Sequence, residues 1–169
     1  WRFGLGQDLD QYSTSSRTGI LNDWVNWVPQ DQASNSIGQN LSATPVQLAA
    51  AYSVFANDGV YVPPTLVAGE TLPAPHRVIA PEVAQGVRSM LGHVMDTGGL
   101  RQARIPGVSA GGKTGTADVY DSALGAYPAD DYALTFAGMF PIEKPEVVVV
   151  VMLMKPEASS TSTYVVAPV

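Results

Sequence analysis

The sequence contains no cysteine, few basic residues and no long hydrophobic run, and each absence removes a class of protein. Without cysteine, the 169-residue chain forms no disulfide and holds no metal through thiolates. Nine Lys and Arg residues against fifteen Asp and Glu give a net charge of −6, which disfavours a nucleic-acid partner because phosphate backbones require clustered cations. The longest apolar run, Val147–Met154, is eight residues long, whereas roughly 20 are needed to span a bilayer.

What is present fits one globular domain. A hydrophobic share of 46% with 14% charged residues supplies enough apolar side chains for a core. His76 and His93 have no metal-ligand spacing, so we expect no metal site and no cofactor. Four aspartates after residue 117 are expected to form a solvated acidic loop near the entrance of a binding groove: Asp118, Asp121, Asp130 and Asp131.

Two helices are indicated by their terminal signals. Thr44, Pro45 and Gln47 provide an N-cap, a first-turn proline and a capping box, so a helix is predicted from residue 44 to about 57, ending at Gly59. It is apolar nearly all round and is therefore expected to be buried. A second helix is predicted from Pro81 to the Gly98-Gly99 pair, with one apolar stripe formed by Val83, Val87, Met90, Leu91 and Val94. Residues 1–39 are predicted to form loops that are held to the core by the packing of Trp1, Trp24 and Trp27.

Three strands are predicted in the second half, over residues 109–117, Tyr132–Phe140 and Val147–Met154. The short turn between the last two makes them an antiparallel pair. The continuous valine run favours a central strand covered on both faces. The expected fold is a layered α/β domain of the α+β type, in which helices cover an antiparallel sheet.

The stretch Gly112-Lys-Thr-Gly-Thr-Ala117 fits two kinds of chemistry. Read from Gly107, it matches the phosphate-loop pattern G-x-x-x-x-G-K-[ST]; read from Lys113, it contains the Lys-Thr-Gly signature of penicillin-recognising serine enzymes. A phosphate loop follows a buried strand and precedes a helix. Here the preceding Arg-Ile-Pro is not a buried strand, and the glycines and aspartates that follow are poor helix formers. A third interpretation gives Lys113 and Gly115 only structural roles, as a solvated strand lysine and a bulge.

Other motifs in the same order favour the enzyme interpretation. The segments Ser36-Ile-Gly-Gln-Asn-Leu-Ser-Ala-Thr-Pro-Val-Gln-Leu-Ala49, the Lys-Thr-Gly stretch, and Tyr132-Ala-Leu-Thr-Phe-Ala-Gly-Met-Phe140 together resemble the C-terminal part of a class B penicillin-binding protein transpeptidase domain. The segments Arg2-Phe-Gly-Leu-Gly6, Ala56-Asn-Asp-Gly59 and Val166-Ala-Pro168 resemble the same family. The resemblance implies the transpeptidase fold shared with β-lactamases.

The resemblance also implies an activity and roles for residues. It implies a peptidoglycan D,D-transpeptidase that cross-links stem peptides through an acyl-serine and binds β-lactams. Lys113 and Thr116 would be catalytic, and Lys113, Thr114, Gly115 and Thr116 would bind the substrate. It further implies two partners, the upstream part of the same domain and the cell-wall synthesis machinery. The implied location is the extracytoplasmic face of the bacterial membrane, and the implied process is cell division or the maintenance of cell shape. An N-terminal membrane anchor would lie in the parent protein.

Two of the three catalytic motifs of the family do not occur in the chain. No Ser-x-x-Lys exists, because the residues three before the lysines at 113, 144 and 155 are Ala110, Pro141 and Met152, and no Ser-x-Asn exists either. We therefore expect residues 1–169 to be a C-terminal portion of one domain, without the nucleophile upstream or the final helix downstream, and to be inactive alone. A non-catalytic binding or scaffolding relative is the alternative. Asn40, where the family usually has glycine, leaves the local turn undetermined.

Overall fold

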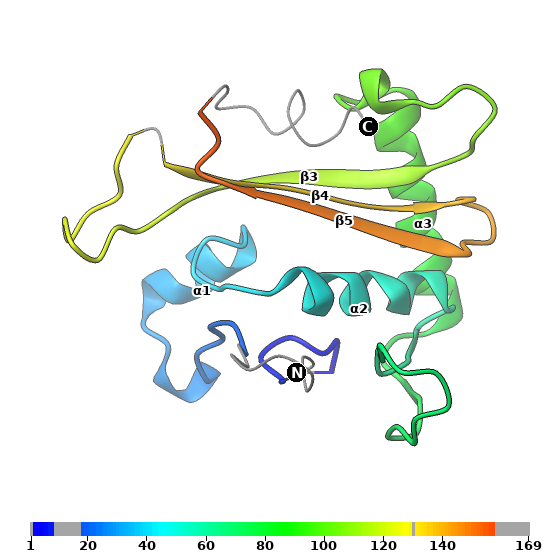
Figure 1. Cartoon of the computed structure of the whole chain (residues 1–169), viewed down its shortest axis with the longest axis horizontal. Coiled ribbons are helices and arrows are strands. Elements are labelled where there is room, and N and C mark those ends of the chain that lie inside the picture. The colour runs from blue at the N-terminus through cyan, green and yellow to red at the C-terminus, as the bar shows by residue number, and fades with distance from the viewer. Residues whose placement is uncertain (1, 9–17, 130, 158–169) are drawn as a thin grey trace.

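The computed structural model describes residues 2–8, 18–129 and 131–157, and places a three-stranded sheet beside two long helices (Figure 1). The long helices are α2 (Pro45–Ala56) and α3 (Pro81–Asp96). The remaining helical elements are short: η1 (Trp24–Asn26), α1 (Pro29–Ser36) and η2 (Arg101–Ala103). The segment between α2 and α3 contains two antiparallel strands of two residues each, β1 (Val60–Tyr61) and β2 (His76–Arg77).

The main sheet is antiparallel, with strand order β3-β4-β5: β3 (Gly111–Asp118), β4 (Tyr132–Phe140) and β5 (Val147–Met154). All three predicted strands are present, the first shifted by one or two residues. The prediction that the valine run forms the central strand is wrong for the described residues, since β4 is central. The most buried residues of the sheet belong to β4, including Leu134, Phe136 and Met139, whereas β5 is only half-buried. An unbroken run of β-branched residues therefore marked a strand without fixing its place in the sheet.

Helix α2 begins as its sequence predicts. The Oε1 of Gln47 accepts the N–H of Thr44 at 2.9 Å, and Oγ1 of Thr44 accepts the N–H of Gln47 at 3.2 Å, which forms the predicted capping box. Gln47 is fully buried, and its Nε2 donates to the carbonyls of Gln7 and Thr18 at 2.6 and 2.8 Å. The same side chain thus caps α2 and fastens the N-terminal segment to it.

The packing of α2 differs in part from its predicted all-round burial. The helix packs against β5, β4 and α3, and Figure 1 shows it running beneath β5. Val54 is completely buried and lies in a cluster with Ala50, Tyr61 and Val78. Val46, in the first turn, is 39% exposed.

The predicted bounds of α3 agree with the structure, but its predicted apolar stripe does not. The buried residues are Ala84, Arg88, Gly92 and Met95, while Val83 and Met90 are 49% and 64% exposed. The helix packs closely against β3: a Cβ built on Gly111 would lie 2.9 Å from the N of Gly92. Close backbone approach selects small residues for the contact face, so the largest apolar side chains do not mark it.

The prediction of loops pinned by tryptophans before residue 40 is also wrong where it can be compared. Short helices η1 and α1 occupy this region, and Trp24 is 75% exposed. Trp1 lies outside the described residues. In the described part of the chain, no helix is both long and apolar enough to cross a membrane.

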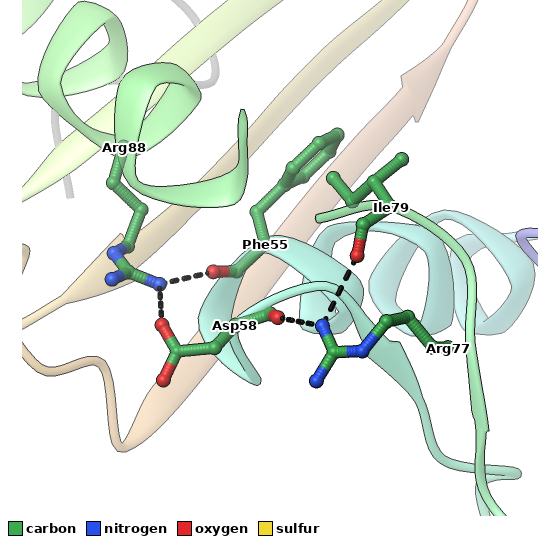
Figure 2. Close-up of polar contacts among 5 residues, drawn as sticks. All are labelled: Phe55, Asp58, Arg77, Ile79 and Arg88. Atoms are coloured by element: carbon green, nitrogen blue, oxygen red, sulfur yellow. Dashed lines mark hydrogen bonds and ion pairs between the residues drawn. The ribbon is translucent and has the colours of Figure 1, made fainter. Parts of the chain in front are cut away.

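A polar network joins the C-terminal end of α2 to α3 (Figure 2). The buried Arg88 Nη1 donates to the carbonyl of Phe55 at 2.6 Å and lies 2.9 Å from Oδ1 of Asp58. Arg77 Nη1 donates to the carbonyls of Asp58 and Ile79 at 2.8 and 3.2 Å. A cation beside the last carbonyls of a helix is favourable for both the hydrogen bond and the helix dipole.

We expect Arg88→Met to destabilise the protein by about 2 kcal/mol, because the substitution removes charge-assisted bonds to a helix end inside the fold. The measurement is urea denaturation of the full-length protein. Arg104→Met is the matched control, because Arg104 pairs with Asp96 at 3.6 Å with both side chains more than half exposed, and such a pair contributes about 0 to 1 kcal/mol. Equal losses for the two variants would contradict the role assigned to Arg88.

Candidate active site

All four predicted site residues lie consecutively in β3. Lys113 and Thr116 are exposed, and Thr114 and Gly115 are half-buried. Strand β3 pairs with β4 on one side, and no strand among the described residues pairs with its other side, which we call the outer edge. The predicted strand for Lys-Thr-Gly is therefore present, and it is an edge strand in the described sheet.

The register fixes which backbone groups of β3 point to the outer edge. Just beyond β3, Val119 donates its N–H to the carbonyl of Asp131 at 2.9 Å, and residues of an antiparallel strand alternate between bonding to the partner and pointing away. Odd-numbered residues of β3 therefore bond to β4. The N–H and C=O groups of Gly112, Thr114 and Thr116 are directed away from β4, along the outer edge.

The side chains of β3 divide between the two faces of the sheet. Lys113 lies opposite Ala137, whereas Thr114 and Thr116 share their face with Phe136 and Leu134, which belong to a buried core. The Nζ of Lys113 donates to the carbonyl of Thr114 at 2.8 Å. The ammonium group is thus exposed and held against the outer edge, where an incoming carboxylate can reach it.

Gly115 permits a close approach between β3 and β4. A Cβ at this position would lie 2.6 Å from Oγ1 of Thr135, whose hydroxyl donates to the carbonyl of Gly115 at 3.4 Å. A bulge at this position, which one interpretation of the sequence required, is absent, because the β3–β4 register runs without interruption from Gly111 to Asp118.

A contact that sequence reasoning missed lies at the far end of β3. The Nε2 of Gln39 donates to the carbonyl of Asp118 at 3.5 Å, which brings the segment after α1 to the outer edge. Asn40, the departure from the family pattern, donates its Nδ2 to Oδ1 of Asp31 at 2.8 Å. No local signal in the sequence linked Gln39 to a strand 79 residues away.

The acidic insertion between β3 and β4 is mostly exposed, as predicted for a solvated loop, and it also contains specific polar contacts. Oδ1 of Asp121 accepts the N–H groups of Leu124 and Ala123, and these two bonds hold the pKa of Asp121 below its usual value. Lys155 pairs with Asp131 at 2.5 Å, and this hydrogen bond raises the pKa of Lys155. Asp118 is exposed, and Asp130 lies outside the described residues. No group of three or more potential metal ligands occurs within the described ranges.

A surface hollow of about 650 Å³ lies beyond the start of β3, away from Lys113. It is lined by residues of the α3 end, the segment before β3 and the β4–β5 turn, including Arg101, Arg104, Ser109 and Glu143. Ser109 Oγ donates to Oε2 of Glu143 at 2.5 Å, and this bond lowers the pKa of Glu143. Because none of the four predicted site residues lines the hollow, we do not assign it to the candidate site.

The phosphate-loop alternative does not fit this geometry. Lys113 and Thr114 lie inside a strand that continues to Asp118, and among the described residues no helix begins after them to direct its N-terminal N–H groups at a phosphate.

Comparison with known proteins gives the family. The model of the penicillin binding protein transpeptidase domain matches residues 1–169. This chain belongs to that family. Penicillin-binding protein PbpB of Mycolicibacterium smegmatis is 36% identical to it, over 94% of this chain and 27% of the relative. The probable peptidoglycan D,D-transpeptidase PenA of Neisseria gonorrhoeae is 32% identical, over 92% of this chain and 26% of the relative.

Solved structures agree with the fold of this transpeptidase chain. Penicillin-binding protein 3 of Mycobacterium tuberculosis, complexed with aztreonam, matches with a TM-score of 0.87 and 33% identity, over 95% of this chain and 40% of that chain. The transpeptidase domain of Burkholderia pseudomallei penicillin-binding protein 3 matches with a TM-score of 0.86 and 34% identity, over 99% and 51% of the two chains. The predicted family and fold class are confirmed. The chain spans about a quarter of the length of its curated relatives.

Proposed function

We propose that this chain forms one wall of the acyl-serine site of a peptidoglycan D,D-transpeptidase that also binds β-lactams. The observation that carries the proposal is the outer edge of β3, where an exposed Lys113 accompanies outward-directed backbone groups of Thr114 and Thr116. An extended peptide can lie along such an edge, with its terminal carboxylate near the ammonium group.

Each residue then has a defined part in the reaction. The serine of a Ser-x-x-Lys motif outside residues 1–169 attacks the penultimate D-Ala carbonyl, the terminal D-Ala leaves, and an amine of a neighbouring stem peptide takes its place. Lys113 and Thr114 attract the substrate carboxylate, and Lys113 tunes proton transfer near the nucleophile. The N–H of Thr116 stabilises the oxyanion, and Gly115 keeps the strand accessible to a peptide backbone. One oxyanion donor is worth about 3 to 4 kcal/mol of barrier.

The proposal extends to location and partners. The active form works at the extracytoplasmic face of the bacterial membrane, where its substrate, the stem peptide of peptidoglycan, is found. The rest of the same domain supplies the nucleophile, and the cell-wall synthesis machinery is the wider partner. The relatives named probable peptidoglycan D,D-transpeptidases support peptidoglycan as the substrate.

Labelling with a fluorescent penicillin tests the proposal. We expect the full-length protein to be acylated at a single serine outside residues 1–169, identified by peptide mass spectrometry, and residues 1–169 expressed alone to remain unlabelled. Stable labelling at a serine within residues 1–169 would contradict the assignment of the nucleophile. A full-length protein that is folded but never labelled would favour the non-catalytic alternative.

A further inference from the structure

One aromatic ring lies across the strand pair immediately before Lys113. Gly112 of β3 and Gly138 of β4 are directly opposite each other, and both are buried. A Cβ built on Gly112 would lie 2.7 Å from Cε2 and Cζ of Phe136, and one built on Gly138 would lie 2.7 Å from the same Cζ. The far end of the phenyl ring therefore fills the space that a side chain at either glycine would need.

The ring is anchored in the core as well as resting on the glycines. Phe136 is 8% exposed and belongs to the buried cluster that contains Met95, Leu100 and Ala103. Its position is therefore fixed by α3, η2 and the segment between them.

The same ring is adjacent to the candidate site. Phe136 is the register partner of Thr114, and Gly112, which the ring covers, directly precedes Lys113. Strand β3 has a single strand partner in the described sheet, and three of its first five residues are glycines, which have little intrinsic preference for an extended backbone. Packing on its face is therefore needed to set where its outer edge lies.

We propose that Phe136 is a positioning residue for the Lys-Thr-Gly strand, and that Gly112 and Gly138 form the surface on which its ring packs. By packing on Gly112, the ring holds the start of β3 in place on β4, and this contact sets the positions of Lys113 and of the outward N–H groups. This inference rests on the proposed acyl-serine function. A displacement of about 1 Å at a reacting centre can lower a rate by up to about 100-fold, so the effect appears in the acylation step.

A compensation experiment in the full-length protein tests the inference. The variants are Gly112→Ala, Phe136→Leu and the double variant, and the readouts are the second-order acylation rate constant with a fluorescent penicillin and the melting temperature. Leucine lacks Cε2 and Cζ, the atoms that a Cβ at Gly112 would meet. We expect each single change to lower the acylation rate about tenfold or more, and the double variant to be acylated faster than Gly112→Ala alone.

Two controls separate positioning from general stability. Val54→Ala removes a fully buried side chain from the separate cluster around α2, which does not include Phe136, so it is expected to lower the melting temperature while leaving the acylation rate within about twofold at 25 °C. Gly86→Ala, on α3 with no neighbouring atom within 4 Å, is expected to combine additively with Phe136→Leu.

The outcomes are distinct. Additive effects of Gly112→Ala and Phe136→Leu on acylation, or a loss of rate in Val54→Ala as large as that in Phe136→Leu, would overturn the positioning role alone. If the unchanged, folded protein were not acylated, the proposed function would fail and this inference with it.

Discussion

Replacing Lys113 by alanine in the full-length protein is expected to lower the acylation rate with a penicillin by about 100-fold or more. Lys113 is the one lysine of β3, it is exposed, and its Nζ is held at 2.8 Å from the Thr114 carbonyl on the outer edge. The substitution removes the cation that receives the ligand carboxylate and tunes the nucleophile, and the loss of one preorganised electrostatic contact in an acyl-transfer site is of this size.

The control for this experiment is Lys144→Ala. Lys144 is also exposed but lies in the turn between β4 and β5, so the variant has the same change of charge at a distance from the outer edge. Acylation rates are measured by quenching the reaction with a fluorescent penicillin after a series of times. Repeating this at several penicillin concentrations separates weaker binding from slower acylation. Similar rates for Lys113→Ala and the unchanged protein would refute the role assigned to Lys113.

The largest expected loss of stability comes from Gly59→Ala. Gly59 follows α2 with φ of +87°, and a Cβ there would lie 2.2 Å from the carbonyl oxygen of Ile79. The main chain of Gly59 also accepts the N–H of Val78 at 2.8 Å, so the clash cannot be relieved without breaking this contact. A strained backbone combined with a backbone clash is expected to lower the free energy of unfolding by about 3 to 5 kcal/mol.

Gly69→Ala provides a matched comparison. Gly69 has φ of +80°, but a Cβ there meets nothing within 4 Å, so the substitution adds only the backbone strain, about 1 kcal/mol. Both variants are compared by chemical denaturation of the full-length protein. Equal destabilisation would mean that the clash with Ile79 adds nothing and that positive φ alone requires glycine at residue 59.

The elements that could be predicted were those with local signals. Thr44, Pro45 and Gln47 gave the start of α2, and the proline at 81 and the glycine pair after 97 gave the limits of α3. These signals work because helix ends need partners for their unpaired backbone groups, and neighbouring residues supply them.

The incorrect predictions concern which face or position an element takes. The predicted stripe of α3 included the exposed Val83 and Met90, and the actual contact face carries Gly92 and Arg88. Arg88 is buried because the carbonyl of Phe55 and the carboxylate of Asp58 satisfy its guanidinium group, and both lie about 30 residues away in the chain (Figure 2). Patterns of hydrophobicity contain no information about such distant partners.

The candidate site, like the fold, was predicted from the sequence only in part. The Lys-Thr-Gly motif and its neighbours along the chain were enough to predict the family and to nominate Lys113, Thr114, Gly115 and Thr116. Gln39 and Phe136 could not be nominated, because each reaches β3 only through tertiary contacts, at Asp118 and at Gly112 respectively.

The sequence by itself determined the family, the strands and long helices, and the motif that carries the proposed chemistry, because these depend on short stretches of neighbouring residues. Only the tertiary structure decided that β3 lies at the edge of the described sheet, that alternate residues direct their N–H groups outward, and that a phenyl ring rests on Gly112 beside Lys113. These features depend on the register and packing of segments far apart in the chain, which many sequences with the same local pattern could arrange differently.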